Sequence, residues 1–223
     1  LPIESDNSAT TTAPDGNKLS LHLRRLTAHV EFIFANGQND ENPKFVPTSY
    51  SIYNLPKNAK VISADNNMLS SNSYQNIENV EIAGSTIEFF MLENPQEYNS
   101  NCTSYGLRDA WDNGSQAAPT KPSDKNFTHA PEDGTFIVVT GEYSGKSYFG
   151  SISYTIHLGN FSGTDSDYSK SGYGNFSVNR NEHHTYKVTV NGVKSIVTES
   201  DVKNDDTVPG AEGELTVVTD KMQ

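Results

Sequence analysis

The chain has 223 residues, of which 34% are apolar, and its formal net charge is −12 at pH 7. This length suits one large β-domain, or one domain with insertions, and the apolar share is enough for a single core. The negative charge argues against nucleic acid and against anionic lipid as partners, because both require a basic surface. The single cysteine, Cys102, excludes an intrachain disulfide and any multi-cysteine metal site.

The N-terminal part begins with a polar stretch, and residues 1–18 are predicted to be a flexible lead-in. In residues 19–34 the apolar positions change parity between Leu23 and Leu26. A one-residue slip would turn half of these side chains away from the core. A β-bulge or a strand break at Arg24-Arg25 is therefore predicted, with both halves facing the sandwich core.

Two further strands are predicted before the middle of the chain, at residues 48–55 and 86–93, because both segments are rich in β-branched and aromatic residues. A short extended piece is expected at 60–62. The Asn- and Ser-rich region 64–79 carries no pattern that predicts an element.

Residues 94–134 are predicted to be a long loop insertion, punctuated by proline and glycine. Loops of this length are uncommon in compact domains and are often functional. The segment contains Tyr98, Tyr105 and Trp111, and a short helix is predicted around residues 104–111.

The clearest alternation lies in residues 148–159, where the apolar side chains fall on one face: Ile152, Tyr154, Ile156 and Leu158. This spacing indicates a half-buried strand. A strand at 136–143 precedes it across a plausible hairpin loop, and a strand at 186–190 follows, with Tyr186, Val188 and Val190 inward. The three strands are predicted to form an antiparallel meander, which ends at the tight-turn dipeptide Asn191-Gly192.

The C-terminal part adds a predicted strand at 193–199, and residues 201–223 form an acidic linker and an extended segment. No long segment has a helical period, so the prediction is an all-β sandwich spanning residues 19–200.

The sequence contains no arrangement that indicates catalysis, a cofactor or a metal. His183 and His184 are adjacent and would point to opposite faces of a strand, so they cannot chelate one ion. Residues 165–169 begin like a calcium loop but lack glycine at the sixth position and glutamate at the twelfth. Ser153 lies on a predicted strand without the sharp turn that a serine nucleophile requires. The protein is predicted not to be an enzyme.

Several segments in order resemble the fimbrillin-like surface proteins of Bacteroidales, in particular the large-subunit or tip-type pilins: 23–30, 90–94, 136–143, 152–159, 175–181, 186–193 and 209–213. The resemblance implies a transthyretin-like antiparallel β-sandwich, the C-terminal domain of a longer lipoprotein exported to the cell surface. It also implies a structural or adhesive role in a fimbria, with other fimbrial subunits as partners and host or bacterial surface ligands as further candidates.

Such subunits assemble when a strand of one molecule fills an open edge of the next, which satisfies apolar and backbone groups together. The candidate donor segment contains Leu215, Val217 and Val218, with pairing inside its own domain as the alternative. The alternative function is a surface glycan-binding lipoprotein domain, in which Tyr98, Tyr105 and Trp111 would stack on sugars.

Overall fold

The structure is a computed structural model that describes residues 3–6, 18–19, 22–37, 43–59, 73–111, 127–146, 148–161, 172–204 and 215–216. The predicted extended piece at 60–62 lies outside the described residues, as do Val217 and Val218.

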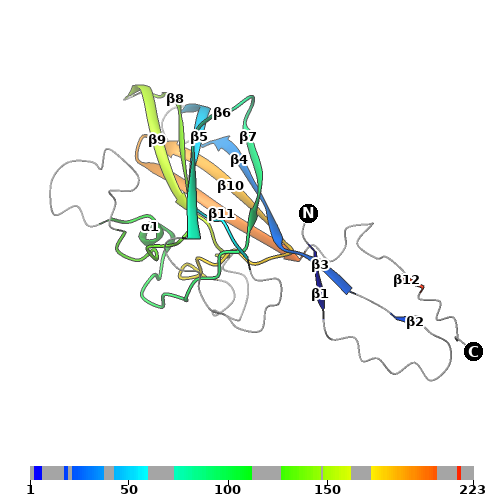
Figure 1. Ribbon diagram of the computed structural model, residues 1–223. Helices are drawn as coiled ribbons and strands as arrows, with labels where there is room; N and C mark the ends of the chain where they lie inside the picture. Colours follow the sequence, from blue (N-terminus) through cyan, green and yellow to red (C-terminus); the bar gives the residue numbers. More distant parts are fainter. Residues whose placement is uncertain are drawn as a thin grey trace, which may run out of the picture.

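Two four-stranded sheets packed face to face form the body of the protein (Figure 1). The first sheet has the order β11 (Ser195–Asn204), β10 (Glu182–Gly192), β4 (Thr27–Asn36) and β7 (Thr86–Leu92). The second has the order β6 (Tyr74–Glu81), β5 (Lys44–Pro56), β8 (Phe136–Ser144) and β9 (Phe149–His157). Neighbouring strands are antiparallel except β4 and β10, which are parallel. The predicted all-β sandwich is confirmed.

The core lies between the two sheets and is built largely from alternate residues of the strands, with no buried side chain from β6. Tyr186, Val188 and Val190 of β10 are fully buried, as predicted, and the ring of Tyr186 stacks on Phe32 of β4 at 4.7 Å. From the second sheet, Ile156 of β9 is fully buried as well. Full burial of such a side chain stabilises the fold by roughly 1.5–3 kcal/mol. Burial of these alternating apolar side chains is therefore the main contribution to the stability of the sandwich.

The predicted three-stranded meander is only partly correct. β8 and β9 form the expected antiparallel hairpin, with Ile137 opposite Ile156. β10 does not continue that sheet but lies in the other one, between β4 and β11. The chain turns away after β9 at Gly159, which has a φ of +141°. A Cβ there would lie 2.1 Å from the carbonyl oxygen of Asn175, so only glycine fits this close crossing.

The predicted break near Arg24-Arg25 is confirmed, because one residue, Leu26, separates β3 (His22–Arg25) from β4. However, β3 does not join the sandwich. It pairs with β1 (Ile3–Asp6) in a separate two-stranded sheet, so the prediction that both halves face the core is wrong. A second small pair joins β2 (Lys18–Leu19) to β12 (Leu215–Thr216). All four short strands lie apart from the sandwich (Figure 1).

Two elements differ in extent from the sequence prediction. β6 lies in the polar region for which no element was predicted, and most of its side chains are exposed. The predicted helix is present as α1 (Tyr105–Arg108), a single turn. The predicted limits of the sandwich domain, residues 19 and 200, stay predictions. β11 itself extends past the second limit, to Asn204.

Candidate functional site at the edge of β7

The edge strands of the two sheets are β11 and β7 in the first and β6 and β9 in the second. Each leaves one row of backbone N–H and C=O groups without a strand neighbour among the described residues. The edge of β6 is irregular, because its pairing with β5 shifts register twice and Asn79 has a φ of 56°. The edge of β9 is capped by side chains. The Tyr148 hydroxyl donates to the Ser151 carbonyl at 3.2 Å, and Asp109 accepts from the His157 amide at 2.9 Å.

The edge of β11 has the α1 region packed alongside it. The Tyr105 hydroxyl donates to Oγ1 of Thr198 at 2.7 Å, and the amide of Phe161 donates to Oγ of Ser200 at 2.9 Å. These contacts fill the opening between the sheets on the β9–β11 side.

The edge of β7 is regular. β7 pairs with β4 along its full length without a register shift. The amide of Phe34 donates to the carbonyl of Ser85 at 3.2 Å, and this bond fixes the parity of the ladder. In an antiparallel pair, every second residue directs its N–H and C=O to the neighbour. The backbone groups that point away from β4 are therefore those of Thr86, Glu88, Phe90 and Leu92, and no described residue hydrogen-bonds to them.

The chain just beyond β7 makes one further strand-like contact. Asn94 and Val178 form an isolated antiparallel bridge, with hydrogen bonds of 2.7 and 3.1 Å in the two directions. The amide of Asn181 donates to the carbonyl of Thr27 at 3.1 Å, so the segment that carries Val178 also contacts the start of β4.

The two faces of β7 differ in chemistry. Ile87 and Met91 are buried in the core, and Phe89 packs against it while half-buried. On the outer face, Phe90 is 54% exposed, and the Glu88 side chain is 59% exposed. A strand added here would cover Phe89 on one face and contact Phe90 and Glu88 on the other.

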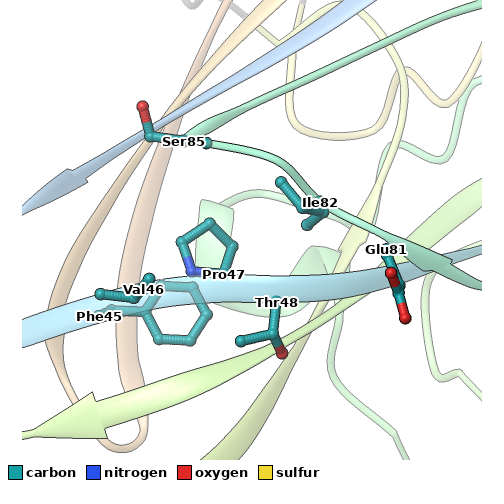
Figure 2. A pocket seen from close by; sticks show the side chains of 8 residues that line it. Phe45, Val46, Pro47, Thr48, Glu81, Ile82 and Ser85 are labelled. Atoms are coloured by element: carbon teal, nitrogen blue, oxygen red, sulfur yellow. The ribbon is translucent and has the colours of Figure 1, made fainter.

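A groove of about 730 Å³ lies near the start of β7, between β5 and the β6–β7 connection (Figure 2). Phe45, Pro47 and Ile82 supply much of its apolar lining. The β5 wall offers few backbone donors, because Pro47 has no N–H and the amide of Phe45 already donates to Oδ1 of Asn36 at 2.7 Å. Strand pairing at this side of the molecule therefore falls to β7, and the groove adds apolar surface beside it.

The long loop insertion is held to the sandwich by a buried arginine. Arg108 is fully buried, and its guanidinium lies 4.1 Å from the ring centroids of both Phe161 and Phe176. It donates to four backbone carbonyls, those of Tyr173, Asn175 (2.8 Å), His157 (3.3 Å) and Leu158 (2.9 Å). Burial lowers the pKa of Arg108, whereas the nearby Asp109 carboxylate favours the charged form. The arrangement anchors the loop.

The three candidate sugar-stacking residues lie in this loop but differ in presentation. Tyr98 and Trp111 are each 39% exposed. Tyr105 packs against the core, with its ring 6.1 Å from that of Phe161, and burial raises its pKa. Cys102, in the same loop, is 2% exposed, and burial raises the pKa of its thiol.

The candidate donor residue Leu215 lies in β12 opposite Leu19 of β2, outside the sandwich.

The adjacent histidines of β10 have different surroundings. His184 is fully buried and hydrogen-bonds Glu182 at 2.9 Å, whereas His183 stacks on His29 with 4.2 Å between ring centroids. The two histidines therefore lie on opposite faces, as predicted. In the described residues, no cluster of three or more His, Cys, Asp or Glu could hold a metal ion. No helix in that part of the chain is long and apolar enough to span a bilayer.

Sequence reasoning located β7 as a strand but not as an edge. Alternation reports which side chains are buried and carries no information on what lies beside the strand. The sequence feature that could have indicated an edge strand is the pair Glu88 and Phe90, a charge and a large ring two residues apart on the outer face.

No protein-family model and no curated protein matches the chain. The sandwich is similar to solved fimbrial and cell adhesion proteins. A cell adhesion protein from Parabacteroides distasonis shares 16% identity at a TM-score of 0.49, over 82% of this chain and 60% of its own. The tip fimbrial protein Mfa3 from Porphyromonas gingivalis shares 12% identity at a TM-score of 0.41, over 82% and 52%. A cell adhesion protein from Bacteroides eggerthii shares 11% identity at 0.44, over 82% and 57%. The chain thus spans about half to three fifths of the length of these proteins.

Proposed function

We propose that the protein is a structural or adhesive domain of a bacterial surface fimbria, and that it assembles with partner subunits by β-strand addition at the edge of β7. The observation that carries this proposal is the regular row of outward backbone groups from Thr86 to Leu92, without a hydrogen-bonding partner in the described residues. Added strands satisfy such groups by main-chain hydrogen bonds, while the side-chain contacts set specificity. The sequence resemblance supports a cell-surface location and fimbrial partners.

The test uses seven-residue synthetic peptides that alternate apolar and polar residues, selected for binding to the full chain from a displayed library. Bound peptides should raise the melting temperature and slow hydrogen exchange at the amides of Glu88 and Phe90. The amides of Ile87 and Phe89 bond to β4 and should be protected with or without peptide. No bound peptide, or protection at another edge alone, would contradict the proposal.

The variant Glu88→Pro removes one outward N–H and keeps the backbone hydrogen bonds to β4, because proline is tolerated on the open side of an edge strand. It also removes the side-chain contact with His29. We expect it to weaken peptide binding at least tenfold. Glu88→Gln keeps the N–H and is the matched control. Ser153→Pro changes the edge of β9 in the same manner and should leave binding unchanged. Weakening by Ser153→Pro and not by Glu88→Pro would place the added strand at β9.

Glycan binding is the alternative function, and the exposure of Trp111 and Tyr98 is the observation that favours it. A glycan array probed with the full chain and with Trp111→Ala separates the two functions. Sugar binding that is lost in Trp111→Ala would support the alternative, and it would leave the peptide results at β7 unaffected.

A further inference from the structure

The outer face of the first sheet carries a stack of three rings that ends at the β7 edge. Phe90, His29 and His183 lie opposite one another on β7, β4 and β10. The ring of His29 stacks on Phe90 at 4.7 Å and on His183 at 4.2 Å. Phe90 is the last ring of this ladder, and its outward face has no ring partner among the described residues. A further strand beside β7 would place its own side chain against that face.

The neighbouring cross-strand row is acidic. Glu88 lies directly opposite Glu31, and like charges in this position repel each other. His29 contacts Glu88 at 2.7 Å, and His183 approaches Glu31 at 3.8 Å. A cation on the outer side of Glu88 would relieve the repulsion. The edge therefore fits an antiparallel strand that carries, in chain order, a ring, one further residue, and a Lys or Arg. Antiparallel pairs outnumber parallel ones, and β7 already pairs with β4 in this direction.

Among the described strands, only β3 contains this spacing, in His22-Leu23-Arg24. β3 lies apart from the sandwich and pairs on one side with β1 (Figure 1). An isolated two-stranded sheet is marginally stable in water and gains from a third strand. The protein thus contains both an acceptor edge and a short strand of complementary chemistry.

The geometry points to β3 of a second copy of this chain as the strand that adds to β7, antiparallel, with Arg24 opposite Glu88 and His22 opposite Phe90. This inference rests on the proposed function and names its partner. In this register Leu23 would lie opposite Phe89, whose half-buried ring is on the inner face. Arg24 already lies opposite Glu4 of β1, so the extended sheet would contain an acid–base–acid row.

The donor must come from another molecule. β3 is joined to β4 through the single residue Leu26, and Thr27 at the start of β4 pairs with Leu92 at the end of β7. One residue spans at most about 3.6 Å, which is too short for β3 to fold back along its own β7. Because each copy carries one donor and one acceptor at different places, the contact is head-to-tail. Such contacts form rings or open filaments.

Sedimentation velocity of the full chain over a range of concentrations tests the inference. We expect concentration-dependent species larger than a monomer. Glu88→Arg and Arg24→Glu should each weaken the association at least tenfold, and the variant with both substitutions should associate more tightly than either single variant. Recovery should be incomplete, because Glu4 of β1 lies opposite position 24. Glu142→Arg, which reverses an exposed charge on β8, is the matched control and should have no effect.

Hydrogen exchange provides a second measurement in case Arg24→Glu disturbs the β1–β3 pair. The amides of Glu88 and Phe90 should become protected as the concentration of the unaltered chain rises. A chain that stays monomeric, single reversals without effect, or no recovery in the double variant would overturn the inference. If selected peptides still bind and protect β7 in that case, the proposed function stands and only the identity of the donor is wrong. If neither the selected peptides nor a second copy of the chain binds at β7, the proposed function and this inference are both wrong.

Discussion

Replacement of Arg108 by methionine should loosen the long loop before it affects the rest of the sandwich. Methionine is long enough to keep contact with Phe161 and Phe176, but it cannot donate to the carbonyls of His157, Leu158 and Asn175. A buried polar group that loses its partner costs roughly 1–3 kcal/mol, and relief of the buried charge offsets part of that sum. We expect Arg108→Met to lower the free energy of unfolding by about 3–5 kcal/mol.

Two measurements follow this change. In a chain of this size about 1 kcal/mol corresponds to 2–4 °C, so the melting temperature should fall by roughly 6–20 °C. Cys102 reports on the loop itself, because its thiol is 2% exposed in the intact protein. If opening of the loop becomes easier by about 3 kcal/mol, a thiol reagent should label Cys102 roughly a hundredfold faster.

Lys203→Met is the matched control, since the Lys203 side chain is 74% exposed and its ion pair with Asp201 is on the surface. It should change stability by no more than about 0.5 kcal/mol. A melting temperature within 2 °C of the original for Arg108→Met, together with unchanged labelling of Cys102, would refute the anchoring role of the arginine.

Two further outcomes concern a half-buried carboxylate and a close backbone crossing. Burial raises the pKa of Glu182, but hydrogen bonds from His184 and Asn179 outweigh it and hold the pKa below its usual 4.5. The stabilisation is present above that value and is lost as pH falls through the lower pKa of the folded state. Denaturation profiles of Glu182→Gln should therefore lie below those of the original chain at pH 7 and converge with them as the pH falls through the lowered pKa of the folded state; a constant gap would contradict this. Gly159→Ala should destabilise by at least about 2 kcal/mol, because of the crossing at the Asn175 carbonyl. Gly106→Ala, with nothing within 4 Å of the added Cβ, should be neutral or stabilising in the same thermal melts.

The sequence predicts the inward faces well because alternation is a local property. β8 and β9 were recognisable for this reason, and a short loop between two alternating segments leaves an antiparallel hairpin as the simplest outcome. The sheet to which β10 belongs is not a local property. It depends on Gly159, which turns the chain across the sandwich, and on the ring of Phe32, against which Tyr186 packs.

The candidate site was less accessible to prediction for the same reason. β6 has almost no buried side chain, so its sequence lacks the pattern that would have revealed it. Arg108 reads in the sequence as one more surface cation, and its role depends on carbonyls contributed by segments far along the chain. That β7 lies at an edge follows only from the complete strand order.

The parallel pairing of β4 with β10 has a consequence for how the protein is made. β4 can pair with β7 early, but its other side stays open until synthesis has passed β10, because His29 lies opposite His183. Contacts between segments so far apart in the sequence form slowly, and an incomplete sheet with exposed strand edges is prone to aggregate with other chains. Shortening the gene so that translation stops before residue 182 should therefore yield insoluble material instead of a smaller domain.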